Sequence, residues 1–400
     1  MKPTPFYPRT EEMCESYSWS DWSGWRSANS YDLDHTHEYL AVRTACAVFD
    51  ASPLYKYLIH GPDALRLMNR IVTQDVSRCA VGRAMYTPWC DDEGKIIDDG
   101  ILARLEEQLF RLTAADPTLF WLEDNAVGLD VTVEEVTEAT AVLALQGPFS
   151  RDLLKTLSKA DFDHLRYFRI IHTELAGIPV TISRTGYTGD LGFEIWVDPH
   201  RALDLWDVLF EAGQAYAIRP FGEYALDMAR IEAGLLLTEV DFHSSKKVLH
   251  EFEKSTPLEL GLGWTVKLDK EYFVGQKALK REKETGSAWA TVGLEVDLKS
   301  LEAIYAEFGM PLYLPYQSWS DAVPVYSGGK QIGKATSGTW SPMLKKYCAI
   351  ARLKPRYARP GAQVEMEVTI DAQRKLAKAT AVSLPFFDPP RKRSLAGDED

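Results

Sequence analysis

The spacing of apolar and polar residues predicts short helices and short strands along the first two thirds of the chain. Residues 35–50 have the pattern of a helix that runs directly into a strand. Residues 84–90 and 96–105 flank the turn Asp91–Gly94, which predicts a β-hairpin. We also expect helices at 63–71, 121–127, 201–213 and 222–234, a helix start at Gly147-Pro148, and strands at 108–114, 131–136, 141–145, 178–184 and 192–197. Because these elements do not alternate as regular βαβ units, the pattern indicates the α+β class.

A change of composition near residue 280 predicts a boundary between two parts of the chain. Lys277–Ser287 is highly charged and ends in Gly-Ser. We expect strands after it at 290–297, 322–326, 331–336, 363–369 and 377–383, with a hairpin turn at Ser327-Gly328-Gly329-Lys330. The pattern therefore predicts an α+β body over 1–280, a small all-β domain over 288–388, and a polar, loose tail over 389–400.

Residues 14–31 are rich in aromatic and serine residues without a helical or strand period, so we expect an ordered but irregular segment. Its aromatic residues are Tyr17, Trp19, Trp22, Trp25 and Tyr31. Aromatic faces attract cations and stack on flat groups, which makes Trp22 and Trp25 candidates for binding a small substrate. The simpler interpretation is that these rings pin an N-terminal arm to the body of the protein.

Composition and charge narrow the functional classes. The chain has 400 residues, of which 46% are hydrophobic and 26% charged, as is typical of globular proteins. With 45 basic and 58 acidic residues its net charge is −13, so nucleic acid and anionic membranes are not expected as partners. Five cysteines without a C-x-x-C pair indicate reduced thiols. The sequence shows no apolar leader and no apolar stretch of membrane length, so we expect a cytoplasmic protein.

Signatures of the common enzyme classes are missing from the sequence. It has no G-x-G-x-x-G after a strand, no Walker loop, no G-x-S-x-G and no H-E-x-x-H, so dehydrogenase, kinase and hydrolase functions lose support. On a strand, His35 and His37 would share one face and could bind a metal ion. The start of a surface helix is the simpler interpretation, and the same holds for Asp241-Phe242-His243. We therefore expect no metal site.

Two adjacent carboxylates interrupt the apolar strand predicted at 96–105. Alternation along a strand places Asp98 and Asp99 on opposite faces, and aspartate is unfavourable in strands. A carboxyl group that points into a cavity acquires a raised pKa, which suits general acid–base chemistry. The alternative is a strand that ends early, with both residues in a turn.

The segment Ser183–Ile195 contains three glycines within seven residues, followed by Glu194. Glycine permits positive φ and close approach of the backbone to a ligand. The Glu194 carboxylate could accept a pair of hydrogen bonds from a flat N–C–N group, such as the aminopyrimidine of a pterin. The alternative is a hairpin loop with a solvated glutamate.

Eight blocks of the sequence, in order, resemble motifs of the T-protein family of folate-dependent aminomethyltransferases and demethylases. Together they extend from about residue 40 to residue 350. The blocks are Ala47–Ser52 ("VFDVS"), Ile59–Ala64 ("GPDA"), Ala84–Tyr86 with Gly94–Asp99 (the "IIDD" hairpin), Leu145–Pro148 ("QGP"), Ser183–Ile195 ("SRTGYTGEDGFE"), Arg230–Gly234 ("RLEAG"), Phe273–Leu279 ("FVGKEAL") and Ser337–Pro342 ("TSGTFSP").

The resemblance implies a three-part cloverleaf fold with tetrahydrofolate in a central channel, a folate-binding body of two subdomains and a barrel-like C-terminal domain. Carried over position by position, it implies that Asp99 is the acid–base residue and that Glu194 grips the pterin ring. It also implies that Tyr86, Tyr187, Arg230 and Trp264 bind the folate cofactor.

The sequence departs from the family motifs near the place where the donor or a lipoyl arm would lie. Pro53 replaces the histidine after "DVS", Leu226 replaces the arginine of "ARD", and Thr113–Asp116 replaces "NAAN". These changes make Leu226 a candidate substrate contact and argue against a role in glycine cleavage. The loop Tyr272–Gln276 lacks the cysteine of the iron–sulfur assembly relatives, and no nucleotide-binding domain like that of the flavin-containing relatives is present.

We therefore expect a tetrahydrofolate-dependent one-carbon transferase that acts as a demethylase. It would move a methyl group from a small N-, O- or S-methylated donor to tetrahydrofolate and give 5-methyltetrahydrofolate, with Asp99 managing the proton. One alternative is the glycine-cleavage aminomethyltransferase, which forms 5,10-methylenetetrahydrofolate and has a lipoyl carrier protein as partner. The other is a non-catalytic folate-binding scaffold.

Overall fold

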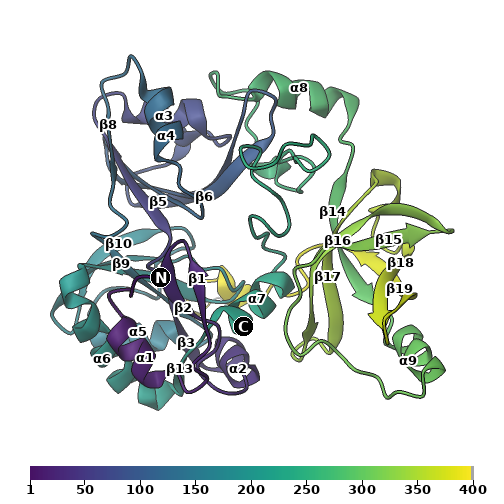
Figure 1. Ribbon diagram of the computed structural model, residues 1–400. Helices are drawn as coiled ribbons and strands as arrows, with labels where there is room; N and C mark the ends of the chain where they lie inside the picture. Colours follow the sequence, from purple (N-terminus) through teal and green to yellow (C-terminus); the bar gives the residue numbers. More distant parts are fainter. Residues whose placement is uncertain (398–400) are drawn as a thin grey trace.

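The structure is a computed structural model, and it describes residues 1–397. Three lobes lie around a central region: a five-stranded sheet, a six-stranded sheet and a closed barrel (Figure 1). Helices pack on both sheets without alternating regularly with the strands. The α+β class and the three-part arrangement with a C-terminal barrel, both expected from the sequence, are confirmed. Within residues 1–397, no helix has the length and apolarity needed to cross a bilayer.

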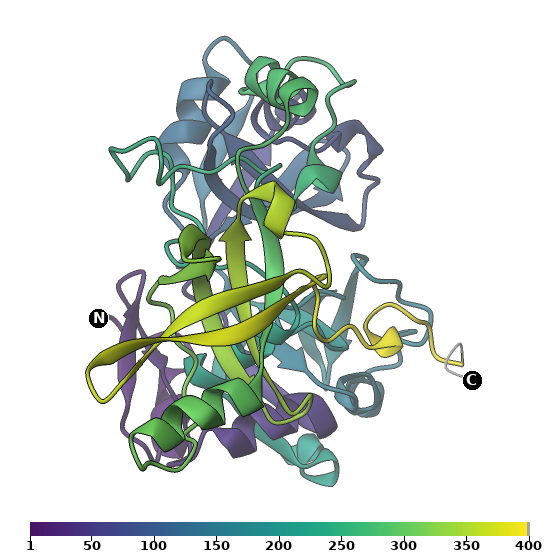
Figure 2. The same ribbon diagram turned by 90° about the vertical axis from the view of Figure 1, so that its right-hand side faces the viewer.

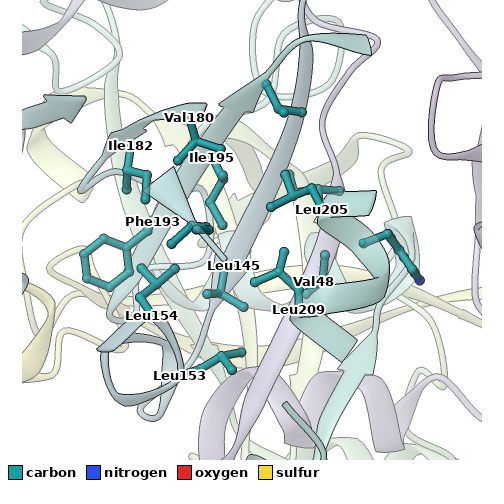
Figure 3. Close-up of a cluster of buried hydrophobic side chains, with 14 of the residues drawn as sticks. Val48, Leu145, Leu153, Leu154, Val180, Ile182, Phe193, Ile195, Leu205 and Leu209 are labelled. Carbon is teal, nitrogen blue, oxygen red and sulfur yellow. The ribbon is translucent and has the colours of Figure 1, made fainter. Parts of the chain in front are cut away.

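A large apolar core lies between the six-stranded sheet and the helices that pack on it. Its order is β10-β11-β12-β9-β3-β13. On β12, Phe193 and Ile195 point into the core drawn in Figure 3, where Leu153 and Leu154 of α5 meet them. Because neighbouring side chains on a strand point to opposite faces, Glu194 faces away from this core. The strands are β3 (Cys46–Asp50), β9 (Ala141–Gln146), β10 (Ile170–Leu175), β11 (Ile178–Ser183), β12 (Gly192–Val197) and β13 (Ile218–Pro220), and the helices of this lobe are α1 (Tyr7–Met13), α2 (Thr36–Thr44), α5 (Ser150–Leu157), α6 (Ala202–Gly213) and α7 (Glu223–Glu232).

The five-stranded sheet contains the predicted hairpin. Its order is β5-β6-β7-β4-β8, and helices α3 (Ala64–Ile71) and α4 (Leu119–Ala126) pack on its apolar face. The strands are β4 (Tyr55–His60), β5 (Arg83–Cys90), β6 (Ile96–Glu106), β7 (Leu109–Ala114) and β8 (Thr132–Glu135). The antiparallel pairing of β5 with β6 confirms the hairpin and sets Pro88 opposite Asp99.

The C-terminal lobe is a closed six-stranded barrel with the order β14-β17-β16-β15-β18-β19. The sequence pattern does not predict β17 or helix α9 (Leu298–Glu307), so the expectation of a purely β domain is wrong in this detail. The charged stretch before the barrel forms helix α8 (Gln276–Thr285), which packs through Leu279. The strands are β14 (Ala290–Val296), β15 (Val323–Ser327), β16 (Lys330–Ser341), β17 (Lys346–Leu353), β18 (Gln363–Ile370) and β19 (Gln373–Val382).

The aromatic N-terminal segment is more regular than expected. Strands β1 (Trp19–Trp22) and β2 (Trp25–Ala28) form a hairpin in which Trp22 pairs with Trp25. Ser23 and Gly24 connect them with φ of +53° and +84°, the backbone of a tight turn whose twist matches that of the strands. The expectation of an irregular segment is therefore wrong.

The C-terminal segment is docked onto the molecule as far as the structure describes it. Figure 2 shows these last residues, in yellow, leaving the barrel and reaching the lobe of the six-stranded sheet. Arg391 forms two hydrogen bonds with the buried carboxylate of Asp190, at 2.7 and 2.9 Å. Because charges far apart in the sequence hold this segment, the described part of the predicted tail is docked at Arg391. Residues 398–400 of that predicted tail lie outside the described residues.

Candidate functional site

Asp99 and Tyr86 form a hydrogen-bonded pair on neighbouring strands of the hairpin. Tyr86 on β5 lies opposite Ile101 of β6, two positions from Asp99, so both side chains share one face of the sheet. The Tyr86 hydroxyl donates to Asp99 Oδ2 at 2.5 Å. Burial raises the pKa of Asp99 to about 6, although the hydrogen bond from Tyr86 opposes the rise. A carboxyl group with this pKa can take up and release a proton near neutral pH.

The neighbouring Asp98 has a different environment. Its side chain is buried, and its two oxygens accept hydrogen bonds from the backbone N–H groups of Asp99, at 2.8 Å, and Asp116, at 3.1 Å. Burial raises the pKa of Asp98, and the charge of Asp99 adds to the rise. Asp98 therefore holds the backbone beyond β7 in place, while Asp99 is bonded to Tyr86.

Trp264 contacts Tyr86 from the long loop between α7 and α8. It lies in the short 3₁₀ turn Gly263–Thr265, and its ring stacks on the Tyr86 ring with the centroids 5.9 Å apart and the planes inclined by 27°. Trp264 nevertheless remains 58% exposed. An open aromatic face beside a half-buried carboxyl group fits a flat heteroaromatic ligand.

The glycine-rich loop between β11 and β12 packs more closely than a Cβ atom would permit. A Cβ at Gly186 would lie 2.1 Å from Gln146 Oε1, and Gly189 has a φ of +73°. The Tyr187 hydroxyl donates to the backbone carbonyl of Leu236. Burial raises the pKa of Tyr187, and the nearby charge of Asp99 contributes to the rise. The structure thus brings Tyr187 into the neighbourhood of the Asp99–Tyr86 pair.

Glu194 offers one oxygen to a ligand. Within residues 1–397, both of its hydrogen bonds arrive at Oε2, from Thr185 Oγ1 at 2.7 Å and from Ser183 Oγ at 3.4 Å. Burial raises the pKa of Glu194, whereas the hydrogen bond from Thr185 and the charge of Arg111 oppose the rise. Oε1 is left to accept a charge-assisted hydrogen bond.

Arg111 is a member of this site that sequence reasoning misses. It lies on β7 of the five-stranded sheet, and its guanidinium carbon is 3.4 Å from the centre of the Trp196 ring on β12. Burial lowers the pKa of Arg111 to about 10, and the charge of Glu194 opposes the fall. Arg111 therefore supplies a cation to Glu194 from the other sheet. A single arginine in an alternating strand gives no sequence signal for such a role.

Arg230 is buried in a network of carboxylates. Its side chain is 1% exposed; Nε donates to Asp227 at 2.6 Å and Nη1 donates to Asp241. Burial opposes the charge of Arg230, but Asp241 and Asp227 outweigh it and raise the pKa. Nη2 has no hydrogen-bond partner among the described residues. One buried donor of this predicted folate-binding side chain is therefore unpaired among the described residues.

The three candidate substrate contacts do not all lie together. Trp22 packs against Phe49 with the ring centroids 5.7 Å apart, and Leu226 of α7 borders the same apolar cluster. Trp25 is buried elsewhere, and the Lys2 ammonium group lies over its ring at 4.5 Å. Trp25 therefore fixes the N-terminal arm, whereas Trp22 and Leu226 border one apolar cluster.

The histidine pairs singled out in the sequence do not assemble. His35 is buried, with Nε2 3.0 Å from the Tyr316 carbonyl oxygen, whereas His37 is exposed. His243 lies beside Glu239 at 3.2 Å. Across residues 1–397, no three His, Cys, Asp or Glu side chains are grouped as metal ligands.

Comparison with known families accounts for most of the chain. Residues 14–270 match the family described as "GCVT N-terminal domain", and residues 317–388 match "Glycine cleavage T-protein C-terminal barrel domain". The chain belongs to the glycine cleavage T-protein family. T-proteins use tetrahydrofolate, so the cofactor expected from the sequence is confirmed, and this T-protein is a folate-dependent one-carbon transferase.

Similar proteins carry two different names. An aminomethyltransferase of Halothermothrix orenii is 33% identical over 391 residues, which cover 97% of this T-protein and 100% of the relative. A trimethylamine-oxide aldolase of Ruegeria pomeroyi is 35% identical over 406 residues, which cover 98% of this chain and 48% of the aldolase. The crystal structure of the glycine cleavage system aminomethyltransferase T of Bartonella henselae is similar with a TM-score of 0.82 and 25% identity, covering 98% of this chain and 99% of that one.

Proposed function

We propose that this T-protein is a tetrahydrofolate-dependent demethylase. It moves an intact methyl group from a small N-, O- or S-methylated donor to tetrahydrofolate and gives 5-methyltetrahydrofolate. Holding two reactants in the geometry for direct transfer supplies much of the rate enhancement in such reactions.

The proposed folate site is built from groups of matching chemistry. Glu194 Oε1 accepts hydrogen bonds from the aminopyrimidine edge of the pterin, and Arg230 Nη2 donates to a folate oxygen. The open face of Trp264, stacked on Tyr86, covers a flat ring. These side chains come from all parts of the body, as expected for a ligand held in a central channel.

Asp99 manages the proton in this proposal. When bound, tetrahydrofolate supplies the nitrogen at position five that accepts the methyl group. Asp99, with its pKa raised to about 6 by burial, receives the proton which this nitrogen releases, or passes it to an ether oxygen of the donor. Tyr86 holds the Asp99 carboxylate in position through its hydroxyl group.

The observation that carries the demethylase proposal is the apolar side chain at position 226. The family motif has an arginine at position 226, where this chain has a leucine that borders the same apolar cluster as Trp22. An apolar side chain at this position suits a methyl group, which has no polar atoms that need hydrogen-bond partners. The name of the trimethylamine-oxide aldolase, of which this chain covers 48%, supports an N-methylated donor; an aldolase releases its carbon as an aldehyde, so the name gives no support to transfer of an intact methyl group.

The names of other relatives favour a second candidate, the aminomethyltransferase of glycine cleavage. In that reaction a lipoyl carrier protein delivers an aminomethyl group, and the product is 5,10-methylenetetrahydrofolate with release of ammonia. The 33% identity to an aminomethyltransferase over nearly the whole chain is its main support. Pro53 and Leu226, which depart from the family motifs, argue against it.

A donor screen separates these candidates. The protein is incubated with tetrahydrofolate and a panel of methylated amines, sulfonium compounds and aryl methyl ethers, and in parallel with an aminomethyl-loaded lipoyl protein. The folate product is identified by mass spectrometry. Formation of 5-methyltetrahydrofolate from a methylated compound supports the demethylase. Methylene product and ammonia from the lipoyl protein alone refute it.

A further inference from the structure

The C-terminal segment 384–396, which we call the strap, joins the barrel to the lobe of the six-stranded sheet (Figure 2). The backbone N–H groups of Phe386 and Phe387 donate to the carbonyl of Glu232 at 2.9 and 2.8 Å. The guanidinium carbon of Arg43 lies 4.2 Å from the centre of the Phe387 ring. The strap is therefore fixed to the end of α7 before it reaches the glycine-rich loop.

The strap then contacts both ends of the glycine-rich loop 184–191. At one end, the fully buried Arg184 donates to the strap carbonyls of Arg391, at 3.0 Å, and Ser394, at 2.7 Å. At the other end, the buried Asp190 accepts two hydrogen bonds from Arg391, at 2.7 and 2.9 Å. A two-pronged arginine–carboxylate pair fixes orientation as well as distance. The strap thus bridges the two points where the loop leaves the sheet.

A third contact holds the middle of the loop. Arg43 Nη1 donates to the carbonyl of Thr188 at 2.9 Å, and the same guanidinium pairs with Glu232 at 2.6 Å and lies against the ring of Phe387. Arg391 in turn donates to the carbonyl of Arg43 at 3.2 Å. The residues that hold the loop are therefore connected to one another through the strap.

We propose that Arg391 is a positioning residue for the folate site. The loop carries Tyr187 and leads into β12, which carries Glu194, and its glycines Gly186 and Gly189 are packed so closely that a small displacement of the loop would break these contacts. Glu194 is held by the pairing of β12 with its neighbouring strands; Arg391, by pairing with Asp190, holds the loop and hence Tyr187 at the spacing from Glu194 that tetrahydrofolate requires. This inference rests on the proposed placement of folate at those two side chains.

The test uses the full-length chain and tetrahydrofolate as the ligand. Arg391→Gln removes the charge and the two-pronged pair. Arg393→Gln is the matched control, because Arg393 belongs to the same strap, is about half exposed, and pairs only with Asp388 of the strap among the contacts described. Calorimetric titration gives the tetrahydrofolate Kd of each protein, and thermal unfolding gives the Tm.

We expect Arg391→Gln to weaken tetrahydrofolate binding between about 2- and 30-fold, with kcat at saturating folate changed less, while Arg393→Gln binds as the unaltered protein does. Arg391→Lys keeps the positive charge but cannot form the two-pronged pair, and it should recover part of the lost tetrahydrofolate affinity. A lower Tm with an unchanged Kd in both Arg391 variants overturns the proposal, since it would show a purely structural strap. If the unaltered protein does not bind tetrahydrofolate, the proposed function fails, and the inference fails with it.

Discussion

At the scale of single residues, the Asp99 carboxyl group carries the proton chemistry of the proposed reaction. Asp99→Asn keeps the size of the side chain and an oxygen that accepts from Tyr86, but it cannot exchange a proton. We expect turnover to fall by about 10²- to 10⁴-fold, while tetrahydrofolate affinity stays within a few fold. Steady-state kinetics and a binding titration measure the two quantities separately. Turnover equal to that of the unaltered protein would remove Asp99 from the mechanism.

The raised pKa of Asp99 also predicts how stability depends on pH. Burial raises this pKa from 3.8 to about 6, so between about pH 4 and pH 6 the folded protein keeps a proton that the unfolded chain has released. The free energy of unfolding therefore falls as the pH rises through this window. Because asparagine does not ionise, Asp99→Asn removes this pH-dependent loss of stability. The variant should be more stable than the unaltered protein at pH 7 by about 1–3 kcal/mol.

Urea denaturation at pH 4, 5.5 and 7 measures this effect. The advantage of Asp99→Asn should shrink to a small remainder near pH 4, where Asp99 is protonated in the folded protein and the pH approaches its unfolded pKa of 3.8. An advantage that is the same at all three pH values would instead indicate a difference in packing.

At the scale of elements, the two tryptophans of the β1–β2 hairpin have different expected roles: Trp22 is a candidate donor contact, and Trp25 is a packing residue. Trp22 borders the same apolar cluster as Leu226, whereas the ring of Trp25 is buried under Lys2. We expect Trp22→Ala to raise the KM of the methyl donor with little change in folate affinity. Trp25→Ala should lower stability by about 3–5 kcal/mol, the usual cost of removing a buried tryptophan. A parallel loss of stability and folate affinity in Trp22→Ala would show that Trp22 is a packing residue too.

The sequence predicts an element well when neighbouring residues in the chain determine it, and poorly when distant segments do. The hairpin that carries Tyr86 and Asp99 follows from apolar strands around Asp91–Gly94, and the sequence predicts it with nearly the observed bounds. Arg111 beside Glu194 and Arg391 on Asp190 could not be predicted, because each contact joins segments that only the tertiary fold brings together.

The same reasoning applies to the parts of the fold that the sequence pattern misses. Strand β17 is buried almost throughout, so its apolar run lacks the alternation by which half-buried strands are recognised. The resemblance to a known family supplied the position of Trp264; for Glu194 the local pattern leaves open both a ligand contact and a solvated glutamate in a hairpin loop, and the resemblance favours the contact. Asp99 differs, because two carboxylates inside an apolar strand already point to a function.

At the scale of the whole molecule, Asp241 joins the body to the barrel. Its carboxylate accepts from Arg230 of α7 and from Thr336 and Ser337 of β16, at 2.6 and 2.7 Å. Asp241→Asn leaves the buried Arg230 short of a counter-charge, and we expect the free energy of unfolding to fall by about 3–5 kcal/mol. Glu239→Gln is the control, since Glu239 is an exposed residue of the same loop and should change stability by less than about 0.5 kcal/mol. Equal effects of the two substitutions would contradict a buried network between the lobes.

An isotope experiment tests whether an intact methyl group passes from the donor to folate. The donor identified in the screen is prepared with a CD₃ group and incubated with tetrahydrofolate and the unaltered protein, and the folate product is analysed by mass spectrometry. Direct transfer keeps all three deuterium atoms, so we predict 5-methyltetrahydrofolate carrying three deuterium atoms. A methylene-bearing folate with two deuterium atoms would contradict the account, because it would show that the methyl group had been oxidised before it reached the folate.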